Sequence, residues 1–71
     1  MHQRAYGIGD IVAFKDRGVS LEGRIVGAEQ VGRADRNGRA PGKWFTVRVG
    51  LFEDVNVPET ALGSILDAAG V

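Results

Sequence analysis

The 71-residue chain contains no cysteine, one histidine and one tyrosine. Without cysteine it can form neither a disulfide framework nor a thiolate metal site. Most arrangements of a nucleophile and a general base also need residue types that are missing here. The single histidine, His2, lies at the N-terminus, where chain ends are commonly poorly ordered. We therefore expect no enzyme activity, no cofactor and no metal.

Long apolar runs are missing too, since no stretch approaches the roughly 18 consecutive apolar residues of a membrane span. The N-terminal segment 1–4 has no apolar signal region. These features predict a cytoplasmic protein without a membrane contact. Residues 1–71 are expected to form a single domain, because a chain of this length supports one core at most.

Excess charge of either sign is absent overall, with nine basic and nine acidic side chains, but the signs are segregated along the sequence. Residues 31–50 hold five basic residues and one acidic residue, whereas residues 51–71 hold four acidic residues and no basic one. Zero net charge does not favour strong non-specific adhesion to nucleic acid. The local basic cluster could still bind phosphate or the acidic surface of a partner.

The most regular pattern in the sequence is alternation of apolar and polar residues, which predicts half-buried β-strands. The expected strands cover residues 10–15, 23–29, 43–51 and 55–57. Between the second and third, residues 32–42 contain the turn pairs Asn37-Gly38 and Pro41-Gly42 and are expected to form a long hairpin loop. Alternation puts Val12 and Phe14 on one face of the first strand. In the third strand it assigns Phe45, Val47, Val49 and Leu51 to the core.

The C-terminal segment has a different period, with apolar residues at positions 61, 62, 65, 66 and 69. This spacing predicts a short helix or helical turn over residues 59–69. Together with the strands it predicts an all-β fold, namely a small barrel of five or four strands with its core at about 8–58. The apolar segment 61–71 would also allow a homo-oligomer, because small barrels leave edges that a second copy can cover.

Four short segments resemble the SH3-like small β-barrels of bacteria: Gly9–Val12, Gly23–Gly27, Phe45–Val49 and Val55–Pro58. The resemblance covers about residues 7–62 and implies the barrel fold, which serves many functions. The first two segments are also similar to the type II dihydrofolate reductases, which line a pore with Val-Gln-Ile-Tyr. Here the corresponding segment is Val-Asn-Val-Pro, so a reductase is only a remote alternative.

One face of the 43–51 strand is the best candidate for a binding surface, because alternation places Trp44, Thr46 and Arg48 together on it. The basic loop leads directly into this strand. An indole beside guanidinium groups can stack on a nucleic-acid base while the cations neutralise phosphates. Tryptophan and arginine are equally favoured as anchors of protein interfaces. The candidate binding residues are Arg33, Arg36, Arg39, Lys43, Trp44 and Arg48.

These observations lead to a hypothesis of a non-enzymatic binding or regulatory module that docks a protein partner through the Trp/Arg face and the 32–43 loop. Zero net charge favours the protein partner. The alternative is a nucleic-acid-binding SH3-like module of the KOW or Tudor-like kind, which the basic segment would suit. A third interpretation is purely structural, with Trp44 packed under the C-terminal segment against Leu62 or Ile65.

Overall fold

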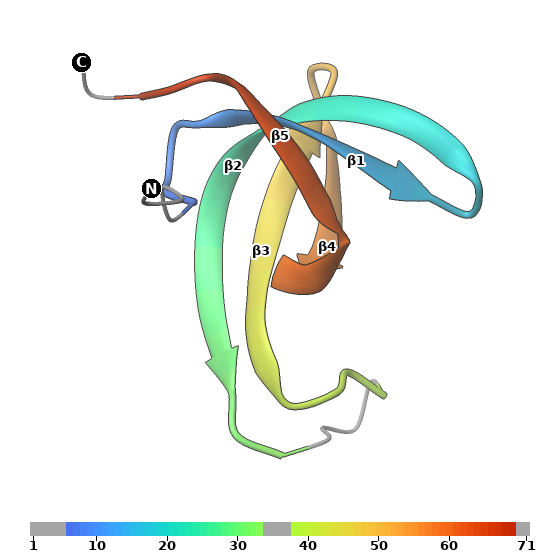
Figure 1. Ribbon diagram of the computed structural model, residues 1–71, viewed down its shortest axis with the longest axis vertical. Coiled ribbons are helices and arrows are strands. Elements are labelled where there is room, and N and C mark those ends of the chain that lie inside the picture. Colours follow the sequence, from blue (N-terminus) through green and yellow to red (C-terminus); the bar gives the residue numbers. More distant parts are fainter. Residues whose placement is uncertain (1–5, 34–37, 70–71) are drawn as a thin grey trace.

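The computed structural model describes residues 6–33 and 38–69, which form one antiparallel sheet of five strands (Figure 1). Its strand order is β4-β3-β2-β1-β5. The all-β prediction is confirmed. The two edge strands, β4 and β5, are not hydrogen-bonded to each other, so the sheet is not closed into a barrel. The elements in chain order are β1 (Ile11–Asp16), β2 (Val19–Val31), β3 (Gly42–Val49), β4 (Glu53–Pro58), the 3-10 turn η1 (Glu59–Ala61) and β5 (Leu62–Asp67).

Strand β2 is the longest, with 13 residues, and curves visibly through the molecule (Figure 1). Its first half pairs with β1 and its second half with β3, so one strand joins both parts of the sheet. The register shifts between Ile25 and Gly27, which is the signature of a β-bulge and bends the strand. At Gly23, an added Cβ would lie 2.6 Å from the carbonyl oxygen of Arg48. Only glycine fits where the backbones come so close.

The core lies on the inner face of the bent sheet, where alternate residues of each strand meet. Phe45 and Val47 are buried, as alternation predicted, and so are Val12 and Phe14, which share one face of β1. Leu51 is an exception, being 81% exposed. Strand β3 ends at Val49, and a turn with Gly50 at φ 69° follows, so the alternation does not continue to residue 51. The buried core cluster consists of Val12, Phe14, Ile25, Phe45, Val47, Val57 and Leu62.

Tyr6, which precedes the first strand, packs against this core and binds the backbone of β5. Its ring meets that of Phe45 edge-on, with the centroids 5.9 Å apart. Its hydroxyl donates to the carbonyl oxygens of Leu62 and Gly63, at 3.2 and 2.6 Å. Tyr6 therefore connects β3 and β5 by side-chain contacts, although these two strands are not neighbours in the sheet.

The predicted C-terminal helix over 59–69 is wrong beyond residue 61, because residues 62–67 form β5 and pair antiparallel with β1. Leu62 lies opposite Phe14 and Ile65 opposite Val12. Three steps along β5 thus correspond to two steps along β1, which requires a bulge in β5. The bulge directs residues three apart toward the core and so imitates helical spacing. Gly63 lies in it, where a Cβ would be 3.0 Å from the carbonyl oxygen of Ala13.

Asp10 is the one charged residue that is completely buried among the described residues. Its Oδ2 accepts a hydrogen bond from the backbone N–H of Gly7 at 2.9 Å, and its Oδ1 accepts one from Ala69 at 2.8 Å. A buried carboxylate is costly unless such donors solvate it. Asp10 therefore ties the segment that enters β1 to the segment that leaves β5.

No helix in the described part of the chain is both long and apolar enough to cross a membrane.

Candidate functional site

The candidate binding face is the surface of β2, β3 and β4 opposite the core, called the outer face below. Phe45 and Val47 point into the core, so the residues between them point outward, as the alternation predicted. Three cross-strand rows follow from the register. They are Glu29–Trp44–Pro58, Gly27–Thr46–Asn56 and Arg24–Arg48–Asp54.

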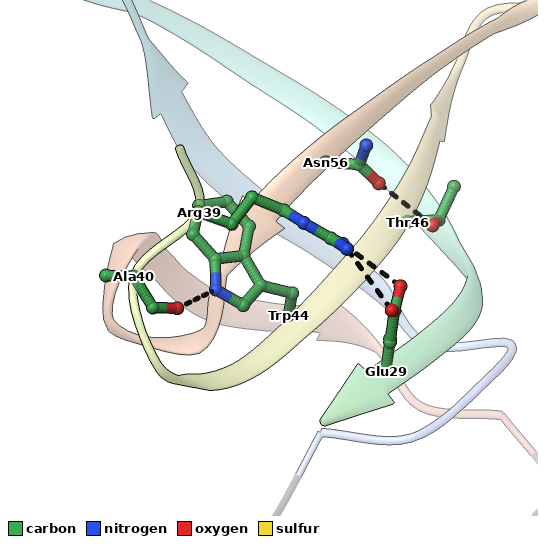
Figure 2. Close-up of polar contacts among 6 residues, drawn as sticks. All are labelled: Glu29, Arg39, Ala40, Trp44, Thr46 and Asn56. Carbon is green, nitrogen blue, oxygen red and sulfur yellow. Dashed lines mark hydrogen bonds and ion pairs between the residues drawn. The ribbon is translucent and has the colours of Figure 1, made fainter. Parts of the chain in front are cut away.

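Trp44 is half-buried at the start of β3, and its position is fixed by the preceding loop. The indole Nε1 donates to the carbonyl oxygen of Ala40 at 2.8 Å (Figure 2). The core cluster and the side chains packed on it include Leu62 and Ile65 but not Trp44. The tryptophan therefore belongs to the outer face and does not fill the place under the C-terminal segment.

A groove of about 400 Å³ runs beside the indole, between the loop and the end of β4. Pro41 and Pro58 contribute apolar surface, while Glu59 and Thr60 of η1 contribute polar groups. Its size falls in the range of pockets that hold a small ligand or a partner side chain. The full lining is Gly38, Ala40, Pro41, Gly42, Lys43, Trp44, Pro58, Glu59 and Thr60.

Arg39 reaches from the loop across the outer face to Glu29 on β2. Its two terminal nitrogens lie 3.0 and 3.2 Å from the two carboxylate oxygens, in a bidentate pair (Figure 2). The guanidinium carbon also lies 5.9 Å from the centroid of the Trp44 ring, within cation–π range. The Arg39 side chain is only 18% exposed, whereas that of Glu29 is 61% exposed. Arg39 thus attaches the loop to the sheet and covers part of the indole.

The other two rows of the outer face are also joined by side-chain hydrogen bonds. Thr46 donates through Oγ1 to Oδ1 of Asn56 at 3.2 Å (Figure 2). Arg48 donates to both carboxylate oxygens of Asp54, at 2.9 and 3.3 Å. This hydrogen bond, together with the positive charge of Arg48, lowers the pKa of Asp54 from its ordinary value. The same contact raises the pKa of Arg48.

Of the remaining predicted residues, Lys43 and Arg33 belong to the described part of the chain. Lys43 lies on the opposite side of β3, with its Nζ 5.4 Å from the centroid of the Phe45 ring. Arg33 is exposed just after the end of β2. Arg36 lies outside the described residues. Of the predicted basic cluster, Arg39 and Arg48 therefore share a face with Trp44.

The partners of these two arginines, Glu29 and Asp54, were missed by sequence reasoning. Neither is adjacent to its arginine in the sequence, and the opposing residue depends on the register of β2, β3 and β4. Opposite charges in strands expected to be neighbours are the only signal the sequence carries. Among the described residues, no group of three or more histidine, aspartate or glutamate side chains is placed to hold a metal ion.

Comparison of the chain with protein-family models, with curated proteins and with solved structures finds no match.

Proposed function

We propose that this chain is a non-enzymatic binding module that docks a protein partner through the outer face and the groove beside Trp44. The observation that carries the proposal is a fixed indole on a face where Arg39 and Arg48 are both paired with carboxylates. The centre of a protein interface typically offers an aromatic anchor with few uncompensated charges. The outer face has the aromatic anchor, and two of its three arginines are paired with carboxylates, the third being the exposed Arg24.

The geometry around Trp44 lowers the cost of binding. Its indole is held by Ala40 and Arg39, so little side-chain entropy remains to be lost on association. The groove next to it can receive one apolar side chain of a partner. Glu29 and Arg48 are 61% and 49% exposed and keep hydrogen-bonding capacity for the polar rim. Such a face suits a partner surface with a protruding apolar residue and neutral polar groups around it.

Nucleic-acid binding by a KOW or Tudor-like module is the alternative, and the same contacts count against it. A phosphate would have to compete with Glu29 for Arg39 and with Asp54 for Arg48. Affinity for a phosphate backbone depends on cations that are available to replace counterions. Lys43 lines the groove, but its Nζ lies 5.4 Å from the centroid of the Phe45 ring and not beside Trp44.

We also propose that the fold is an open relative of the SH3-like barrels that the sequence resembles. Three features support this: the five antiparallel strands, the long strand β2 shared by both parts of the sheet, and the short η1 turn before the last strand. The missing pairing between β4 and β5 is where the chain departs from a closed barrel. Because such folds host many functions, the proposed function rests on the outer face and not on the fold.

Site-directed photo-crosslinking in the cell of origin tests the docking proposal. A photoreactive amino acid at Thr46 samples the middle of the outer face, and one at the exposed Ser64 on β5 is the matched control. We expect a protein adduct from position 46 that is lost when Trp44→Ala is added, with folding checked by circular dichroism. Equal adducts from both positions, or an adduct insensitive to Trp44→Ala, would contradict the proposal.

Titration with short single-stranded and duplex oligonucleotides distinguishes nucleic-acid binding from docking of a protein partner. Trp44 is the sole tryptophan, so its fluorescence reports directly on the outer face. We expect no quenching at ~50 or ~200 mM salt, concentrations between which phosphate-dependent binding changes strongly. Salt-sensitive quenching that Arg39→Ala weakens would establish nucleic-acid binding in place of the protein partner. NADPH-dependent dihydrofolate turnover is the corresponding assay for the remote reductase alternative.

A further inference from the structure

The hairpin between β3 and β4 ends in two strongly exposed apolar residues, called the hairpin tip below. Leu51 is 81% exposed and Phe52 is 94% exposed. Hairpin turns are normally built from polar residues and glycine, because they are surrounded by water. A phenylalanine in this position contributes almost nothing to the core, whereas burying it against another surface is strongly favourable. The hairpin tip is therefore suited to insertion into an apolar hollow.

A shallow apolar pocket of about 310 Å³ lies between β1, the start of β2 and the segment from η1 into β5. Ala13 and Phe14 of β1, together with Ala61 and Gly63, supply its apolar walls. Lys15 is the one charged residue in its lining. The complete lining, called the β1 pocket below, is Ala13, Phe14, Lys15, Ser20, Ala61 and Gly63.

We propose that the hairpin tip of one copy of this chain inserts into the β1 pocket of a second copy. Shape and charge both support this partner. Phe52 is an apolar knob and the pocket is a mostly apolar hollow large enough for one aromatic ring. Glu53 follows the knob directly and is exposed, so it can pair with Lys15 at the pocket rim.

The charges also favour one orientation of the contact and disfavour an anionic partner. Glu22 lies opposite Ala13 on the neighbouring strand, so the acidic end of the hairpin tip has to face Lys15. Glu53 beside the hairpin tip would repel an anionic lipid surface, whereas the charge of Asp54 is paired with Arg48. A second copy, which carries a basic residue at an apolar pocket, is the better match.

The contact joins two different surfaces of the chain, so it is head-to-tail. Repetition of such a contact gives a ring or an open chain of copies, unless two copies exchange their hairpin tips and close a dimer. The hairpin tip lies at the end of β3 opposite Trp44, whereas the β1 pocket, through Ala61, adjoins Thr60 of the groove. One aromatic knob in one small pocket buries less than a stable interface needs, and we expect weak, concentration-dependent association.

Sedimentation of the full chain from about 10 µM to about 1 mM tests the proposal, since weak complexes dissociate across this range. We expect the wild type to rise above its 7.6 kDa monomer mass with concentration, and Phe52→Ser to remain monomeric. Lys15→Glu should weaken the association, and adding Glu53→Lys to it should restore much of the loss. Ile8→Ser is the matched control, because Ile8 is 65% exposed and belongs to neither surface.

Three results would overturn the proposal. The first is a wild type that stays monomeric throughout. The second is unchanged association in Phe52→Ser, and the third is an equal loss of association in Ile8→Ser. Binding of the wild type to phosphatidylcholine vesicles, lost in Phe52→Ser while no protein assembly forms, would assign the hairpin tip to a lipid surface and also overturn it. Circular dichroism of each variant ensures that only folded chains are compared.

Discussion

Two aspartates that each accept two hydrogen bonds have opposite roles in this molecule. Asp10 is completely buried and accepts backbone N–H groups from Gly7 and Ala69. Asp54 is 42% exposed and is bound by the side chain of Arg48. The partners of Asp10 are fixed by the course of the chain, whereas those of Asp54 can move and can be replaced by water or by a partner. Similar local chemistry thus holds the fold together at one site and leaves a surface available for recognition at the other.

The difference follows from where the charge is solvated. In the interior, removing one side of a polar contact leaves the other side without solvation, whether that is the carboxylate or the donors that faced it. On the surface, water takes the place of a lost ion pair, and measured effects are small. Stability should therefore be sensitive to inner polar contacts, and binding to outer ones.

The largest effect is expected from Asp10→Ala. It leaves two backbone donors, those of Gly7 and Ala69, without their buried acceptor and should destabilise the fold by about 2–5 kcal/mol. For a domain of this size that is a large share of the total free energy of unfolding. Urea denaturation followed by circular dichroism measures it. Asp67→Ala is the control, because it removes an exposed carboxylate at the same end of the molecule. Equal losses of stability in the two variants would contradict the difference between buried and exposed carboxylates.

A glycine pair extends the comparison from charge to backbone packing. Gly23→Ala would place a methyl group 2.6 Å from the Arg48 carbonyl oxygen and 2.6 Å from Cγ1 of Val47. We expect a loss of about 1–3 kcal/mol, because the strands must move apart. Gly32→Ala meets nothing within 4 Å and should change stability by less than about 1 kcal/mol. Thermal unfolding of both variants measures the difference, and a neutral Gly23→Ala would refute the close approach.

Tyr6→Phe isolates a single polar contact at the boundary between core and surface. The variant keeps the edge-on packing on Phe45 but loses the hydroxyl that binds Leu62 and Gly63. We expect a loss of about 0.5–1.5 kcal/mol, between the effects of the buried and the exposed contacts. Urea denaturation measures it. Unchanged stability would show that water replaces the hydroxyl without cost, as on the outer face.

The smallest effect is expected from Arg48→Gln, and it depends on pH. Arg48 lowers the pKa of Asp54 in the folded chain, so the ion pair stabilises the fold above the ordinary aspartate pKa of about 3.9. This contribution is lost as the pH falls through the lowered pKa. NMR titration of the Asp54 carboxyl carbon should show its pKa rising in the variant. An unchanged pKa would mean that the ion pair does not persist in solution.

The strands were largely predictable because alternation is a local property. The expected strand at 10–15 corresponds to β1, and the segments 43–51 and 55–57 fall on β3 and β4 with shifted ends. What alternation could not supply were the bulges. The bulge in β5 gives a strand the residue spacing of a helix, and β2 (Val19–Val31) begins before and ends after the predicted range 23–29.

The outer face was predictable in part for the same reason. Alternation placed Trp44 and Arg48 together, and it also separates Lys43 from them, since Lys43 shares the parity of Phe45. The carboxylates that neutralise the arginines come from other strands, and their positions depend on register. Asp10 had a weak signal, because an aspartate after glycine at the start of an apolar strand often binds nearby backbone donors.

The contact that Asp10 makes between the segment entering β1 and the segment leaving β5 affects how this protein can be attached to a support. Because its carboxylate binds both Gly7 and Ala69, the chain enters and leaves the sheet at one point. The loop that carries Arg39 lies at the far end of β2 and β3 (Figure 1). An affinity tag or a surface linker on either terminus should therefore present the groove beside Trp44 outward, in the same orientation.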